Sequence, residues 1–141
     1  MSKREKVIKR AAEMIAELGV KSLRVDDLAS DLGISKRTLY EMFGDKEELL
    51  YCSIKEILQR EAEEIKTKMT VGYSGIPALF ETFDAMMSGS AVRKRITENL
   101  AKFYPELYER IMTENRDYGL ATLREKLNSL VAEGLISEMV N

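Results

Sequence analysis

The stretch between residues 25 and 43, VDDLASDLGISKRTLYEMF, constrains the fold of this chain more than any other. Its apolar residues recur at spacings of three and four on both sides of Gly33, which predicts two short helices, about 25–32 and 36–43. Gly33 suits a position just past a helix end, because glycine adopts positive φ without a steric cost. Ser35 suits the N-cap of the second helix, since its hydroxyl can accept a bond from a free backbone N–H. The stretch therefore predicts two helices joined by a tight turn.

The second of these helices would expose a polar face. If Leu39 packs on the first helix, the helical period turns the neighbouring polar residues outward. Such a face fits the major groove of DNA, because Arg can form two bonds to guanine, Thr and Tyr reach phosphate or a thymine methyl, and Lys meets phosphate. The alternative is a helical hairpin with a solvated polar face. The residues of this face are Lys36, Arg37, Thr38, Tyr40 and Glu41.

The charge distribution restricts nucleic-acid binding to a local patch. Of 141 residues, 22 are Lys or Arg and 24 are Asp or Glu, so the net charge is −2 and the chain is not a polycation. Five of the first ten residues are basic and one is acidic, and Lys36, Arg37 and Lys46 add basic charge around the second short helix. The hydrophobic content of 45% is enough for a core, and two prolines leave room for long helices.

The rest of the chain also shows the helical period, and no strand pattern of useful length is visible. We therefore predict an all-α fold, with an N-terminal three-helix head, a long connecting fourth helix and a further helical lobe. Residues 71–75 contain two glycines and a serine and are predicted to form a loop between the fourth and fifth helices. The predicted helices cover residues 3–18, 25–32, 36–43, 46–69, 76–87, 91–103 and 105–133.

The residue inventory argues against an enzyme. The chain has no histidine and one cysteine, so it lacks the commonest general base and cannot build a Cys/His zinc site or an intramolecular disulfide. No glycine-rich phosphate loop is present, and adjacent acidic residues do not face each other on a helix. We expect no cofactor and no metal. No signal peptide and no apolar run long enough for a membrane span is visible, so we expect a cytoplasmic protein.

The second lobe is rich in aromatic and methionine side chains. Methionine fills irregular space, and pockets for apolar ligands are often lined by such residues. The same residues would also suit an ordinary core, and the sequence leaves both interpretations open. The candidate ligand-pocket residues are Phe80, Phe83, Met86, Met87, Phe103, Tyr104, Tyr108 and Met112.

Residues 8–50 resemble the DNA-binding head of the TetR family of bacterial transcriptional regulators. The resemblance is carried by the run IKRAAEMIAELGVKSLRVDDLASDLGISKRTLYEMFGDKEELL. It implies a regulator, usually a repressor, that binds palindromic operator DNA as a homodimer and responds to a small apolar ligand in the second lobe. Arg24 stands where such sequences usually carry Ser or Thr, and Arg37 where they often carry a small residue. The implied DNA contacts fall on Arg24, Ser35, Lys36, Arg37, Thr38, Tyr40 and Lys46.

The resemblance also implies two domains: a helix-turn-helix domain at residues 1–45 and a helical regulatory and ligand-binding domain at residues 46–141. Family members typically continue with two more helices that build the dimer, so the second domain is expected to be incomplete relative to the family. An alternative therefore stays open. It is a helical interaction protein, or a truncated regulator, without productive operator binding.

Overall fold

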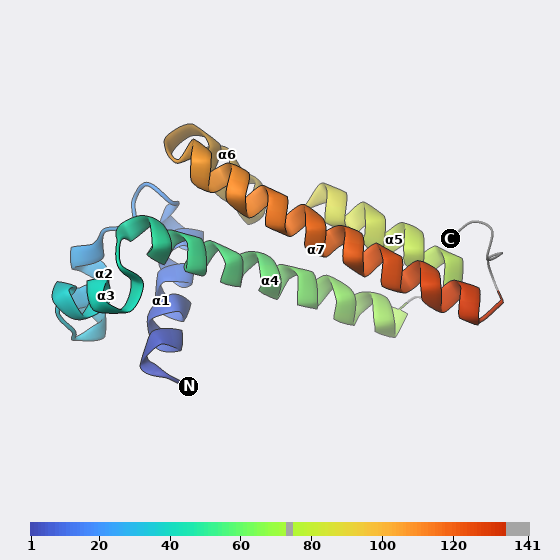
Figure 1. The fold of residues 1–141 in the computed structure, drawn as a ribbon, viewed down its shortest axis with the longest axis horizontal. Helices are drawn as coiled ribbons and strands as arrows, with labels where there is room; N and C mark the ends of the chain where they lie inside the picture. Colours follow the sequence, from blue (N-terminus) through green and yellow to red (C-terminus); the bar gives the residue numbers. More distant parts are fainter. Residues whose placement is uncertain (73–74, 135–141) are drawn as a thin grey trace. The chain divides into compact units, whose positions relative to one another are not determined.

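The computed structural model describes residues 1–72 and 75–134, without the side chains of residues 68–72, 78, 82, 86 and 88. No strand occurs in these two ranges, so the all-α prediction is confirmed. The described residues form seven helices, which Figure 1 labels in chain order. They are α1 (Lys3–Leu18), α2 (Val25–Leu32), α3 (Lys36–Phe43), α4 (Lys46–Gly72), α5 (Gly75–Ser88), α6 (Ala91–Phe103) and α7 (Pro105–Ala132).

The junction between α4 and α5 differs from the prediction. The predicted loop at residues 71–75 is wrong at its ends, because α4 continues to Gly72 and α5 already begins at Gly75. Residues 73 and 74 lie outside the described residues. Once a helix is nucleated, each added residue gains a backbone hydrogen bond, and a glycine costs only about 1 kcal/mol relative to alanine. The helix can therefore include Gly72 as its last described residue, which makes it 27 residues long.

Two side-chain caps fix where α3 and α4 begin. The Oγ of Ser35 accepts a hydrogen bond from the backbone N–H of Thr38 at 3.1 Å. The Oδ1 of Asp45 accepts one from the backbone N–H of Glu48 at 2.8 Å. Each cap satisfies a backbone donor that has no partner inside its helix. Gly33 ends α2 with a φ of 68°, in the left-handed region that favours glycine, so the turn predicted around it is confirmed.

The chain divides into two compact units, and the first consists of residues 1–59 and 90–111. It joins α1, α2, α3 and the first part of α4 to α6 and the start of α7. Within it, α2 and α3 lie side by side, and α3 leads through a short turn into α4 (Figure 1). Its core contains the largest fully buried side chains of the described residues: Val7, Ile15, Val20, Leu23, Leu28, Leu39, Leu50, Ile54, Ile96, Leu100 and Ile111.

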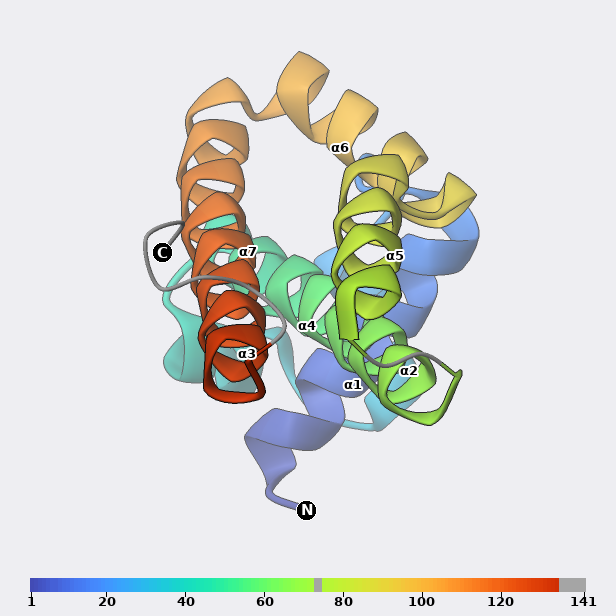
Figure 2. The ribbon, with the colours of Figure 1, turned by 90° about the vertical axis from the view of Figure 1, so that its right-hand side faces the viewer.

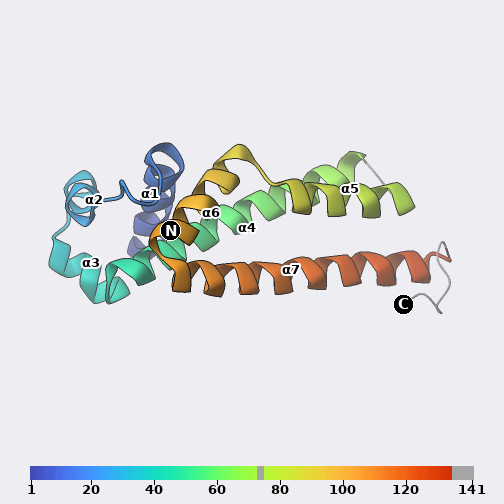
Figure 3. The same cartoon turned by 90° about the horizontal axis from the view of Figure 1, so that it is seen from above.

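Helix α6 lies against α1 within this first unit (Figure 2, Figure 3). The guanidinium of Arg95 on α6 donates a hydrogen bond to the carbonyl oxygen of Ala16, near the end of α1. The ammonium of Lys21, just after α1, lies 4.7 Å from the ring centroid of Phe103, a cation–π contact. These contacts make α6 part of the same packed unit as the helix-turn-helix.

The second unit consists of residues 60–89 and 112–141, of which the structure describes 60–72, 75–89 and 112–134. It contains the end of α4, all of α5 and most of α7. The hydroxyl of Tyr118 on α7 donates to Oε1 of Glu63 on α4 at 3.4 Å, and Leu130 of α7 is buried. Across residues 1–72 and 75–134, no helix is both long and apolar enough to cross a membrane.

Candidate DNA-binding surface

The back of α3 is apolar and buried. Leu39 and Phe43 are only 2% and 5% exposed, and Leu28 of the neighbouring α2 is fully buried. The guanidinium of Arg4 on α1 lies over the Phe43 ring, 4.9 Å from its centroid, in a cation–π contact. This packing fixes which side of α3 faces the interior. The polar side predicted from the sequence faces solvent, as an element that enters a DNA groove must.

Ser35 and Thr38 form a pair of hydroxyls at the start of α3. Their two side-chain oxygens lie 2.9 Å apart, in addition to the cap bond from the Thr38 backbone. Ser35 is exposed and Thr38 is half-buried. A hydroxyl can donate one hydrogen bond while it accepts others, so both side chains can bind a phosphate oxygen without giving up the cap.

Lys36 pairs with a carboxylate of the preceding helix. Its Nζ lies 3.0 Å from Oδ1 of Asp26 on α2. The hydrogen bond to Asp26 and the charge of that carboxylate raise the pKa of Lys36 above its ordinary value, so Lys36 carries its full charge at neutral pH. Both side chains are more than half exposed, and salt screens such a pair. A DNA phosphate can therefore replace Asp26 as the partner of Lys36 at little cost.

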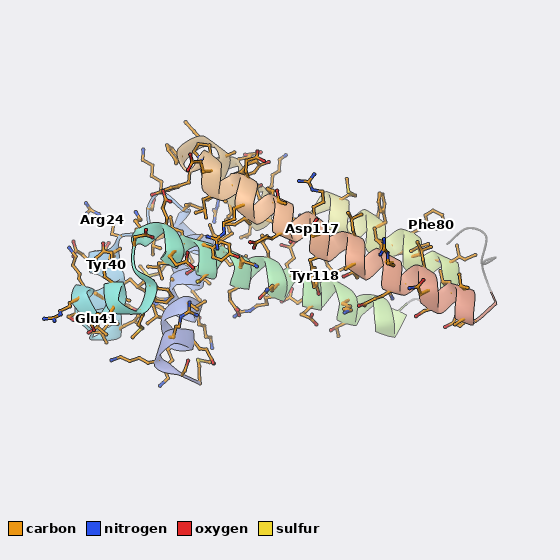
Figure 4. All side chains as sticks on the ribbon, in the orientation of Figure 1. Arg24, Tyr40, Glu41, Phe80, Asp117 and Tyr118 are labelled. Carbon is orange, nitrogen blue, oxygen red and sulfur yellow. The ribbon has the colours of Figure 1, made fainter. Side chains whose placement is uncertain are left out.

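Arg37 pairs with a carboxylate of its own helix. Its Nε lies 3.1 Å from Oε1 of Glu41, one helical turn later, and the two side chains are 89% and 63% exposed. Figure 4 shows Glu41 on the surface of α3. A guanidinium has five N–H donors, so a bond through Nε leaves both terminal amino groups able to bind a guanine edge.

Tyr40, Arg24 and Lys46 complete the predicted surface. Figure 4 shows Arg24 and Tyr40 around α2 and α3, and Tyr40 is 40% exposed. Arg24 is the N-cap residue of α2, and its exposed side chain makes no capping bond. Lys46 is half-buried at the first position of α4. All seven predicted DNA-contact residues thus lie in the first unit, in or next to α2, α3 and the start of α4. Their contact with DNA stays a prediction.

The sequence predicts Glu41 on the polar face of α3, but neither Glu41 nor Asp26 is among the predicted DNA contacts. The pairing of Arg37 with Glu41 has a sequence signal, because residues four apart lie on one side of a helix. The pairing of Lys36 with Asp26 has no such signal, since it depends on how α2 packs against α3. Two basic side chains of the surface, Lys36 and Arg37, are therefore each paired with a carboxylate, so the net positive charge of the surface is smaller than its number of basic residues.

Three of the predicted ligand-pocket residues belong to the first unit. Phe103, Tyr104 and Tyr108 lie at the end of α6 and the start of α7, and all three are half-buried. The ammonium of Lys102, like that of Lys21, lies near the Phe103 ring, at 5.3 Å from its centroid. Phe103 thus takes part in the contact between α6 and the end of α1. A ligand-binding role for these residues stays a prediction.

The other predicted pocket residues belong to the second unit. Phe80, Phe83 and Met87 of α5 are 68%, 49% and 71% exposed, and Figure 4 shows Phe80 projecting away from its helix. Met112 on α7 is half-buried, and the side chain of Met86 lies outside the described residues. The apolar face of α5 that the sequence predicts therefore exists, and it is open to solvent within the described residues.

The buried scaffold and the outward polar side of α3 give the first unit the architecture of a helix-turn-helix domain. Residues 7–51 match the family described as bacterial regulatory proteins, tetR family. The matched segment spans α1 from Val7 onward, all of α2 and α3, and the first residues of α4. It therefore includes the surface described above. This match confirms the resemblance of the N-terminal segment to the TetR family that was seen in the sequence.

Two proteins of Bacillus subtilis (strain 168) are similar in sequence. The chain is 36% identical over 53 residues to the uncharacterized HTH-type transcriptional regulator YezE, which covers 38% of this chain and 27% of that regulator. An alignment of 149 positions with the fatty acid metabolism regulator protein shows 27% identity. This alignment covers 92% of this chain and 75% of that protein. The chain therefore spans about a quarter of the first relative and three quarters of the second.

Solved structures share the fold. A protein from Rhodococcus sp., described as a TetR-family transcriptional regulator, superposes with a TM-score of 0.70 at 23% identity, covering 96% of this chain and 74% of that one. A protein with the same description from Mesorhizobium loti MAFF303099 gives a TM-score of 0.61 at 18% identity, covering 92% and 71%. The similarity to both extends through the helices beyond the helix-turn-helix.

Proposed function

We propose that this regulator is a repressor that acts in the cytoplasm, binds a palindromic operator as a homodimer through α3, and responds to a small apolar ligand in the region after residue 45. The observation that carries the DNA-binding part is the exposed polar side of α3 above the buried Leu39 and Phe43. The repressor role, the dimer and the ligand rest on the family resemblance.

The side chains of the surface divide into two roles. Arg37 would bind a guanine through its terminal amino groups, because a planar forked donor matches the O6 and N7 acceptors with two parallel bonds. Lys36 and Lys46 would bind phosphates, as would the hydroxyls of Ser35 and Thr38. Arg24 would reach the phosphate backbone from the start of α2. Tyr40 would contact a phosphate or a thymine methyl.

The first prediction concerns the operator. Selection from a random duplex library should enrich a palindrome, and footprinting should protect two half-sites about one helical turn, or a multiple of it, apart. In each chain of the dimer, Arg24, Lys36 and Lys46 would each neutralise one phosphate, so binding would release about six counterions. A plot of the logarithm of the binding constant against the logarithm of the salt concentration should then have a slope of about −5. Replacing Lys36 by alanine should make this slope shallower by about 2.

Light scattering on the free and DNA-bound protein measures the stoichiometry in the same experiment. A single protected half-site with one bound chain would contradict the homodimer. Failure to enrich any sequence, with weak binding that is the same for all duplexes, would contradict the operator and favour the helical interaction protein.

The second prediction concerns the effector. One relative is described as a fatty acid metabolism regulator protein, and its similarity extends over 92% of this chain. The exposed Phe80, Phe83 and Met87 supply apolar surface in the second unit. We expect a long-chain fatty acid to change the affinity for the selected operator by about 5–150-fold, the usual range of allosteric coupling. Fluorescence anisotropy of labelled operator measures the change. A short-chain acid of the same charge is the control, and equal effects of the two acids would contradict an apolar effector.

A further inference from the structure

We propose that Glu41 is a specificity-determining residue of the DNA-binding surface, because it positions the Arg37 guanidinium for one guanine. This inference rests on the proposed function and concerns the same surface. Glu41 would act through Arg37, as a positioning residue, and would not itself need to touch a base.

The contact between the two side chains has the geometry that such a role requires. Arg37 Nε and Glu41 Oε1 lie 3.1 Å apart, and the residues are four apart in α3. The bond uses the inner nitrogen of the guanidinium. In residues 1–72 and 75–134, no other hydrogen bond or ion pair of Arg37 is found, so its two terminal amino groups point to no protein partner.

Positioning matters here because Arg37 is otherwise unrestrained. Its side chain is 89% exposed, so no packing selects one rotamer. A free arginine side chain gives up rotamer freedom when it binds a base, and a guanidinium fixed in advance gives up less. With Nε held by Glu41, the terminal amino groups present the two parallel donors that match guanine O6 and N7.

The charge of Glu41 adds a second contribution to specificity. A carboxylate on the face that approaches DNA is repelled by phosphates, and this repulsion weakens binding to every sequence alike. At the correct site, the bond to Arg37 neutralises the carboxylate while Arg37 binds guanine. At other sites no guanine lies opposite Arg37, so its terminal amino groups gain no paired bonds that offset this repulsion. The pair therefore penalises non-specific binding more than specific binding.

The other ion pair of the surface does not have this property. Lys36 carries a compact ammonium with no preferred plane, so Asp26 cannot direct it toward a particular base edge. Asp26 also belongs to α2, whereas Arg37 and Glu41 share one helix and move with it into the groove. The positioning role is thus specific to Glu41.

The test compares Glu41→Ala, which removes the acceptor, with Glu41→Gln, which keeps an acceptor oxygen but loses the charge. The probes are duplexes of the wild-type selected site that carry each of the four base pairs at the position where Arg37→Ala relaxes the preference. We expect Glu41→Ala to reduce the preference for guanine at least about threefold and to tighten binding to random duplex DNA. Glu41→Gln should tighten random binding equally and retain most of the guanine preference.

Glu17→Ala is the matched control, because it removes an exposed carboxylate from α1, outside the surface. Far-UV circular dichroism verifies that each variant is folded, and Glu41→Met, which also lacks the acceptor, replaces the alanine variant if that variant is not. An unchanged guanine preference in Glu41→Ala would overturn the inference, and so would equal losses in the alanine and glutamine variants, since charge alone would then explain them. If the wild-type protein selects no DNA sequence, or if Arg37→Ala changes no base preference, the proposed function itself is contradicted. That result differs from a failure of the inference about Glu41 alone.

Discussion

Replacing Leu28 by alanine should lower the free energy of unfolding by about 2–5 kcal/mol. Leu28 is fully buried in α2, in the core that also receives Leu39 of α3. The substitution removes apolar contact area and leaves a cavity that the surrounding helices fill only in part, and both effects destabilise the folded state. Urea titration followed by far-UV circular dichroism measures the change as a lower midpoint with a similar slope.

Leu18→Ala is the matched control for this prediction. Leu18 ends α1 and is 57% exposed, so the same chemical change there should stay within about 0.5 kcal/mol. A loss at Leu28 no greater than that at Leu18 would contradict the packing described for α2. Leu28 belongs to α2, which packs against α3, the helix that carries the polar surface. The Leu28→Ala variant should therefore bind operator only at temperatures where the variant is still folded.

Arg37→Ala is expected to weaken binding to the selected operator by about 1–3 kcal/mol per half-site and to relax the preference at one base pair. The side chain is 89% exposed, and its hydrogen bond and ion pair with Glu41 are the only ones found among the described residues, so its removal should leave the fold unchanged. Fluorescence anisotropy with operator duplexes that vary at each position measures both effects.

Arg37→Lys separates charge from recognition. Lysine keeps the positive charge, so the salt dependence of binding should stay close to that of the wild-type protein. It lacks the planar fork, so the base preference should fall below that of the wild-type protein, toward that of the alanine variant. If lysine preserves the full base preference, the planar fork of Arg37 is not what recognises the base, and the proposed role of its two parallel donors is wrong.

The helices of the first unit could be predicted because their signals are local. The bounds Lys3–Leu18, Val25–Leu32 and Lys36–Phe43 agree with the sequence prediction. In each case the apolar period, a capping hydroxyl or a glycine lies within a few residues of the helix end it determines. The outward side of α3 was predictable for the same reason, since Leu39 fixes the rotation of a helix only two turns long.

Features that depend on packing between helices could not be predicted in this way. The sequence shows that Phe80, Phe83 and Met87 lie on one side of α5, but it does not show that they are exposed. It shows that Asp26 is an acidic residue at the start of α2, but not that its carboxylate reaches Lys36. Periodicity identifies the face of a helix, whereas the partner of that face is set by tertiary structure.

The inclusion of α6 in the first unit affects how the protein becomes structured during its synthesis. The bond from Arg95 to Ala16 joins residues 79 positions apart, and residues 90–111 complete a unit that begins at residue 1. While residues 60–111 are being translated at about 5–20 residues per second, the side of α1 that α6 later covers stays in water for about 3–10 s. The N-terminal helices are synthesised first, but the core of their unit is complete only after residues 90–111 have been synthesised.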